Sequence, residues 1–96
     1  MVARVHPDAL AEMTEAARFY EDRAPGLGRE FFEEVVAVLR AAVENPEAGA
    51  TQEPPYRRML CRRFPFAVIY RQADDELRVL AVAHQRRRPG YWKERD

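Results

Sequence analysis

The sequence lacks the features that would assign it to a membrane, metal-binding or disulfide-rich class. No apolar run approaches the roughly 18 residues that a membrane-spanning helix requires, and the first residues show no basic segment followed by a long apolar run. Cys61 is the only cysteine, so no intramolecular disulfide can form. Only His6 and His84, both far away in the sequence, could join it as zinc ligands. We therefore expect a cytoplasmic protein without metal, cofactor or membrane contact.

Motifs for several common chemistries are missing as well. The four glycines are scattered along the chain and form no phosphate-binding loop. Neither a Cys–His nor a Ser–His–Asp arrangement is recognisable. The acidic residues lie mainly in segments with helical periodicity, which indicates solvated helix faces rather than a pair of catalytic carboxylates. The sequence itself thus predicts a small binding domain or an RNA-active domain.

Charge is present in quantity but is unevenly distributed. The formal net charge is zero, yet residues 1–55 hold five arginines and eleven acidic residues, a net charge of −6. Residues 56–96 hold ten arginines, one lysine and five acidic residues, a net charge of +6. A basic half predicts an anionic or acidic partner. The alternative is self-neutralisation, in which the acidic helices fold against the basic half.

Two helices are predicted in the acidic half of a single domain spanning residues 1–96. His6-Pro7-Asp8 is typical of a helix start, and the first helix ends before Pro25-Gly26. Gly28 precedes the second helix, over residues 29–44, which ends at Asn45-Pro46 because the residue before proline avoids the helical region. The apolar stripe of the first helix is Leu10, Met13, Ala17 and Tyr20. The second helix has two adjacent stripes, Phe32, Val36, Leu39, Val43 and Phe31, Val35, Val38, Ala42.

Strands are predicted on both sides of the helices. Residues 2–5 form a short first strand, residues 46–55 a loop, and residues 56–63, 66–72 and 76–84 an antiparallel meander with its last turn at Asp74-Asp75. The predicted fold is α+β, with an N-terminal strand, a two-helix hairpin packed on one face of a small antiparallel sheet, and a basic C-terminal tail. We expect Phe32, Leu39, Val68 and Leu80 to be buried between helices and sheet, and the other sheet face to be open for binding.

The candidate functional residues are mostly arginines of the basic half. Arg58 and Arg62 share one strand face, because residues four apart in a strand point the same way. Arg86, Arg87 and Arg88 follow the last strand directly, beside His84, which can move protons near neutral pH. The candidate target- or partner-binding residues are Arg58, Arg62, Arg71, Arg86, Arg88 and Trp92. Tyr91 and Trp92 either stack on a partner or fill the core at the sheet edge.

The chain resembles the RelE/ParE superfamily, the toxins of type II toxin–antitoxin modules. The similar segments are, in chain order, Ala9–Tyr20, Gly28 with Phe31-Phe32, Asn45-Pro46 with Gly49, Arg57-Arg58, Phe64–Arg71, Val79–Arg87 and Pro89–Trp92. The resemblance implies a helical hairpin on an antiparallel sheet and a cognate antitoxin that wraps the toxin. It also implies one of two activities, since RelE-like members cut mRNA on the ribosome without a metal and ParE-like members poison DNA gyrase.

The resemblance leaves the target open, with a ParE-like gyrase inhibitor favoured. If the chain were a nuclease, the catalytic candidates would be His84, Arg87 and Tyr91. One departure counts against that activity, because Ala67 stands where RelE-like nucleases commonly carry an arginine. A third alternative is a member that only binds its antitoxin. None of these activities implies a cofactor.

Overall fold

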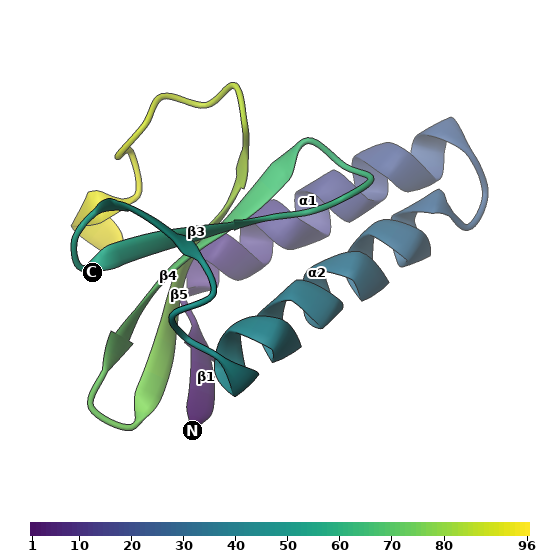
Figure 1. Cartoon of the computed structure of the whole chain (residues 1–96). Coiled ribbons are helices and arrows are strands. Elements are labelled where there is room, and N and C mark those ends of the chain that lie inside the picture. The colour runs from purple at the N-terminus through teal and green to yellow at the C-terminus, as the bar shows by residue number, and fades with distance from the viewer.

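The computed structural model describes all of residues 1–96 and places two helices on one face of a five-stranded sheet (Figure 1). The elements are β1 Val2–Val5, α1 Pro7–Arg23, α2 Leu27–Glu44, β2 Ala50–Glu53, β3 Tyr56–Leu60, β4 Phe66–Ala73, β5 Glu76–His84 and a 3-10 turn at Lys93–Arg95. The strand order is β1-β5-β4-β3-β2, with β1 parallel to β5 and the other pairs antiparallel. The predicted α+β fold is confirmed. Neither helix is long and apolar enough to cross a membrane.

Both helices begin where side chains satisfy their first backbone N–H groups. At the start of α1 the His6 ring accepts a hydrogen bond from the N–H of Asp8 at 3.0 Å. At the start of α2 the carboxylate of Glu21 accepts the N–H groups of Gly26 and Gly28 at 3.0–3.1 Å. These bonds explain why α2 begins at Leu27, two residues earlier than predicted. Gly28 lies inside α2, where an added Cβ would stand 2.4 Å from the Ala17 carbonyl oxygen, so glycine lets α1 and α2 approach closely.

Two strand predictions are wrong. Residues 46–55 were expected to form a loop, yet Ala50–Glu53 pairs with β3 as the edge strand β2. The strand expected over residues 56–63 ends at Leu60, because the Glu34 carboxylate on α2 accepts the N–H groups of Arg62 and Arg63 at 2.6 and 3.0 Å. These hydrogen bonds turn the chain toward α2. Arg62 therefore lies in the turn and not on the same strand face as Arg58.

The main core lies between the helices and the sheet, and α2 contributes a different stripe from the one expected. Phe31, Val35 and Ala42 are completely buried there, together with Val68 on β4. Phe32 is 43% exposed, so the prediction that it lies in the core is wrong. Leu39 is half-buried and packs against the core, so the prediction for it is partly right. Either stripe of α2 could have faced the sheet, and the helix is rotated toward Phe31.

The opposite face of the sheet is covered in part by the C-terminal tail, which Figure 1 shows in yellow across the sheet from the helices. Trp92 is 7% exposed and packs with Leu80 on the small side chains of Ala67, Ala81 and Ala83, next to Ile69. Leu80 is thus buried as expected, but beneath the tail rather than beneath the helices. The expectation of an open sheet face holds only where the tail does not reach.

Candidate functional site

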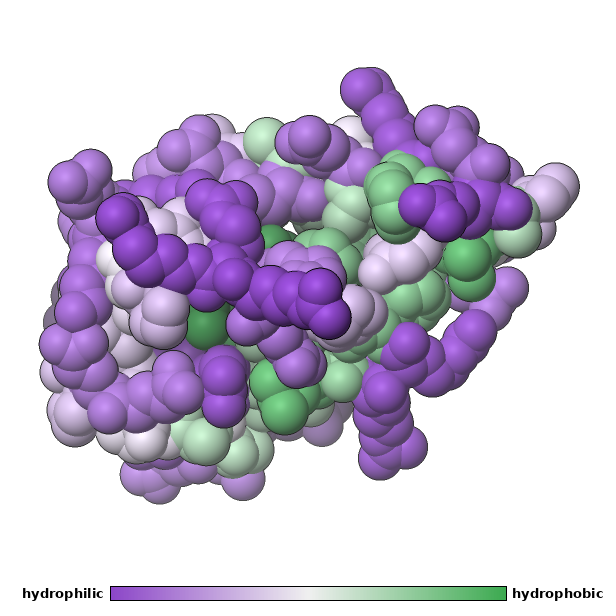
Figure 2. All heavy atoms as spheres, turned by 90° about the horizontal axis from the view of Figure 1, so that it is seen from above, coloured by the Kyte–Doolittle hydropathy of each residue, from purple (hydrophilic) through white to green (hydrophobic).

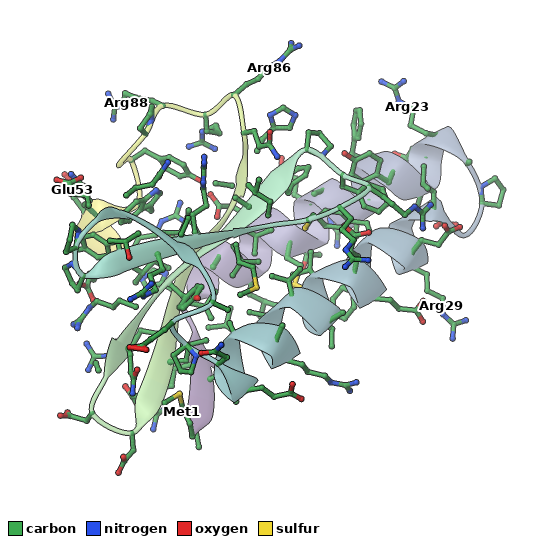
Figure 3. The ribbon with its side chains drawn as sticks, in the orientation of Figure 1. Met1, Arg23, Arg29, Glu53, Arg86 and Arg88 are labelled. Atoms are coloured by element: carbon green, nitrogen blue, oxygen red, sulfur yellow. The ribbon has the colours of Figure 1, made fainter.

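The most basic part of the surface is the loop that follows β5. The carbonyl of His84 accepts the N–H of Arg87 at 2.9 Å, and the His84 Nδ1 atom accepts the N–H of Arg86 at 3.1 Å. These two bonds turn the chain sharply at the end of β5, so that residues 85–88 are all exposed. Figure 3 shows the side chains of Arg86 and Arg88 reaching outward from this loop. The local structure therefore presents consecutive arginines to a partner.

A hollow of about 100 Å³ lies between this loop and the sheet face opposite the helices. Arg58 on β3, His84 at the end of β5 and Gln52 on β2 line it from the sheet side, over a floor that includes Ala67 and Ala83. The predicted site residues that line it are Arg58, His84, Arg87, Arg88, Tyr91 and Trp92. The structure thus brings together six of the nine predicted residues, because β4 pairs with both β3 and β5 and places Arg58 two strands from the end of β5.

The remaining three predicted residues lie outside this hollow. Arg86 points outward from the loop (Figure 3), and Arg62 is in the β3–β4 turn beside α2. Arg71 lies toward the other end of β4, where its Nε atom donates to both carboxylate oxygens of Asp96 at 2.7 and 2.8 Å. Burial raises the pKa of Asp96, but hydrogen bonds from Arg71 and Tyr56 outweigh burial and hold that pKa below its usual range. Arg71 therefore anchors the end of the tail.

The arginines around the hollow carry an excess of positive charge. Arg63 and Arg95 of the basic half form ion pairs with the helix carboxylates of Glu30 and Glu12. Part of the basic half is therefore neutralised by the acidic helices, which is the self-neutralisation considered from the sequence. No carboxylate lies within ion-pair distance of the loop arginines or of Arg58. Arg87 instead stacks on Tyr91, with its guanidinium carbon 3.8 Å from the ring centroid. These unpaired charges are the strongest signal for an acidic or anionic partner.

The hydroxyl of Tyr91 is engaged by the first helix. It donates a hydrogen bond to the Glu12 carboxylate at 2.6 Å. Burial, followed by this hydrogen bond and the charge of Glu12, raises the pKa of Tyr91 to about 12. A phenol with that pKa, bound to a carboxylate, is poorly suited to exchange protons with a substrate near neutral pH. Tyr91 therefore acts here as a structural contact of the tail.

A second hollow, larger and more apolar, lies on the other side of the loop arginines. It measures about 360 Å³ and runs between α1 and the ends of β4 and β5. Its apolar lining is Ala16, Phe19, Tyr20, Phe66 and Val82; Arg87 and His84 line one side, and the acidic Glu12 and Glu15 of α1 also border it. Figure 2, which views the molecule from above, shows hydrophobic atoms open to solvent between hydrophilic side chains. We call this hollow the α1 groove.

Two features of the site were missed by sequence reasoning. Phe19 is 52% exposed and is overlain by Arg23, whose guanidinium carbon lies 4.5 Å from the ring centroid. Its only sequence signal was a large aromatic residue beside the apolar stripe of the first helix. Glu12 was interpreted as part of a solvated helix face, but its side chain is only 15% exposed and contacts the tail. No group of three or more histidine, cysteine and acidic side chains is placed to hold a metal ion.

Comparisons with known proteins give one consistent result. A family model described as ParE toxin of type II toxin-antitoxin system, parDE, matches residues 3–89. The chain is 33% identical over 87 residues to Toxin ParE2 of Mycobacterium tuberculosis, from both strain CDC 1551 / Oshkosh and strain ATCC 25618 / H37Rv, which covers 90% of this chain and 83% of that protein. The fold is similar to a structure titled Chromosomal ParDE TA system from P. aeruginosa, with a TM-score of 0.76, 20% identity, and coverage of 88% of this chain and 95% of that chain.

Proposed function

Since the chain belongs to the ParE toxin family and is the toxin component of a type II toxin–antitoxin system, we propose that it arrests growth by inhibiting DNA gyrase. Membership in such a system provides a cognate antitoxin as its first partner. The target is reached through the loop of residues 85–88 with Arg58, and the cell compartment of action is the cytoplasm. This activity requires binding and no bond-breaking chemistry by the chain itself.

The observation that carries this proposal is how the ionisable residues near the loop are used. A nuclease needs a group free to move a proton. The Tyr91 hydroxyl is bound to Glu12, and the His84 ring accepts the N–H of Arg86 through Nδ1, so the Nε2 atom of His84 is the one group of these two side chains left for proton transfer. The arginines of the loop have no carboxylate partner and are free to meet a complementary surface. This division favours recognition of a macromolecular target over acid–base catalysis.

The exposed apolar lining of the α1 groove supports a protein partner. Phe19 is half exposed next to the basic side formed by Arg87 and His84. Aromatic residues and arginines are the side chains most enriched at the centres of protein interfaces. A surface that combines an apolar groove with unpaired arginines suits both the antitoxin and gyrase as binding partners. In this proposal the antitoxin protects cells because it competes with gyrase for that surface.

The first experiment measures gyrase supercoiling with the purified chain and three variants. We expect the wild type to inhibit, and Arg87→Ala to raise the half-inhibitory concentration by about tenfold, the loss of roughly 1.4 kcal/mol of binding. His84→Gln keeps a polar side chain but cannot act as an acid or base, so it should inhibit within about twofold of the wild type. Arg40→Ala is the matched control, because Arg40 is exposed on α2 and forms no ion pair.

The opposite result identifies a nuclease. Mapping of mRNA ends in a translating extract would then show cleavage caused by the wild-type chain, with no effect on supercoiling. Loss of that cleavage in a folded His84→Gln variant would assign proton transfer to His84 and refute the gyrase proposal. Growth arrest alone cannot distinguish the two targets, which is why both assays are run on the same protein preparations.

A further inference from the structure

Glu12 lies at the junction of the first helix, the last strand and the C-terminal tail. Its Oε1 atom accepts the backbone N–H of Val82 at 3.0 Å, and its Oε2 atom accepts the Tyr91 hydroxyl at 2.6 Å. The guanidinium of Arg95 binds both carboxylate oxygens at 2.9 and 3.1 Å. One side chain thus binds three residues that are 70 or more positions away from it in sequence, one on β5 and two in the tail. A mostly buried carboxylate requires such partners, because its desolvation is otherwise costly.

These contacts replace a missing strand at the edge of β5. The parallel pairing of β1 with β5 ends at Val5 and Val79, so the rest of β5 has a strand neighbour only on the β4 side. Along that edge, Glu12 accepts the N–H of Val82, and Arg95 donates to the carbonyl of Leu80 at 3.0 Å. The pair of side chains satisfies backbone groups that would otherwise be left without a partner at a partly buried edge. This explains why the tail returns to this place in the fold.

The same carboxylate reaches the target-binding loop through one intermediate. Tyr91 is held by Glu12, and the guanidinium of Arg87 stacks on the Tyr91 ring at 3.8 Å. Arg87 is exposed, forms no ion pair and borders both hollows, so the Tyr91 ring is the surface that orients its side chain. The rest of the loop is attached to the fold mainly by backbone turns, such as the N–H of Arg87 to the carbonyl of His84.

We propose that Glu12 is a positioning residue for target binding: through Tyr91 it fixes the direction in which Arg87 and the basic loop are presented. Glu12 borders the α1 groove, but both of its carboxylate oxygens are engaged by Val82, Tyr91 and Arg95, so its effect on binding passes through Tyr91 and Arg87. This inference rests on the proposed function in one respect, because both assume that the loop of residues 85–88 contacts the target. It goes further by naming a residue on α1, outside the basic half of the sequence, on which that contact depends.

The test is a double-mutant cycle that combines Glu12→Gln with Arg87→Ala, read as the half-inhibitory concentration on gyrase supercoiling. Glutamine conserves size and one oxygen acceptor but removes the charge that binds Tyr91 and Arg95. We expect Glu12→Gln to weaken inhibition about tenfold in the wild-type background and by less than about twofold in the Arg87→Ala background, because the two residues act through one contact. A purely structural role of Glu12 would give the same loss in both backgrounds.

Two further variants keep the test decisive. Tyr91→Phe removes only the hydroxyl and leaves the Glu12–Arg95 pair intact, so it reports on positioning even if Glu12→Gln folds poorly. Asp22→Asn is the control, since Asp22 is an exposed acid on the same helix and forms no hydrogen bond through its side chain.

Limited trypsin digestion provides a second readout. Cleavage after Arg86 and Arg87 should accelerate in Glu12→Gln and Tyr91→Phe but not in Asp22→Asn, because release of Tyr91 frees the loop.

Three results would overturn the assignment: equal losses in both backgrounds of the cycle, full potency of folded Glu12→Gln and Tyr91→Phe, or full potency of Arg87→Ala. Failure of the proposed function has a different signature, namely a wild-type chain that leaves supercoiling unaffected. In that case the same cycle is measured as growth arrest in titrated expression. Coupling between Glu12 and Arg87 there still decides whether Glu12 positions the loop.

Discussion

Single residues of this protein take opposite roles according to what they contact, as the tyrosines show. Tyr70 is completely buried, and its hydroxyl donates to the carbonyl of Pro46 at 2.9 Å while accepting the N–H of Gly49 at 3.0 Å. A Cβ at Gly49 would stand 2.4 Å from that hydroxyl, so glycine is required for this approach. Tyr91 instead joins the tail to Glu12. Neither hydroxyl is free to react with a substrate.

The raised pKa of Tyr91 makes a prediction for alkaline stability. Folding favours the protonated phenol, so its contribution to stability is complete below the ordinary pKa of 10 and disappears as the pH rises toward about 12. The unfolding free energy of Tyr91→Phe should therefore fall less steeply than that of the wild type between these two pH values. Urea titrations followed by circular dichroism at several pH values measure the slopes. Parallel slopes in the two proteins would show that the Tyr91 pKa is not raised by folding.

At the scale of elements, α2 shows how a helix with two apolar stripes chooses one for the core. Phe31 contacts the rings of Tyr20, Phe64 and Phe66 with centroid distances of 5.0–5.3 Å. The neighbouring Phe32 borders an open surface between α1 and α2. The rotation of α2 is thus set by an aromatic cluster whose members come from three different parts of the chain. Periodicity within the helix alone could not distinguish the stripes.

This rotation predicts unequal effects for two adjacent phenylalanines. Phe31→Ala should lower the free energy of unfolding by about 3–5 kcal/mol, the usual cost of removing a buried aromatic ring. Phe32→Ala should cost less than about 1 kcal/mol, because that ring already contacts solvent. Chemical denaturation of both variants under identical conditions makes the comparison. A larger loss for Phe32→Ala would mean that α2 faces the sheet with its other stripe.

The whole molecule could be predicted in part from its sequence. The bounds of β5 and the position of α1 follow from strong periodicity and from Pro7. The edge strand β2 was missed because Ala50–Glu53 has no apolar alternation, and its place is fixed by pairing with the next strand, β3, and by the Arg57 side chain donating to the carbonyl of Gly49 at 2.9 Å. The arginines of the site were found because consecutive charges are visible in a sequence. Glu12 was not found, because its partners lie at the far end of the chain.

The separation of charge over the whole molecule predicts how fast the toxin meets its target. Ten arginines lie in residues 56–96, and those around the loop are unpaired, so opposite charge on a target steers the encounter. Association with purified gyrase should slow by about tenfold or more between low and high salt, whereas dissociation should change much less. Surface-immobilised binding kinetics at several salt concentrations measure both rates. Association that does not respond to salt would exclude electrostatic steering by the loop.

The pairing of β1 with β5 also governs when the chain becomes a toxin during its synthesis. The only strand partner of β1 is β5, which begins more than 70 residues later, at Glu76. The helical hairpin can form early from local contacts, but its buried stripe has no sheet to cover it until β4 and β5 leave the ribosome. The basic loop emerges later still. We therefore expect the sheet and the basic loop to assemble only when the chain is almost complete, so that an antitoxin present at that moment meets a newly formed surface.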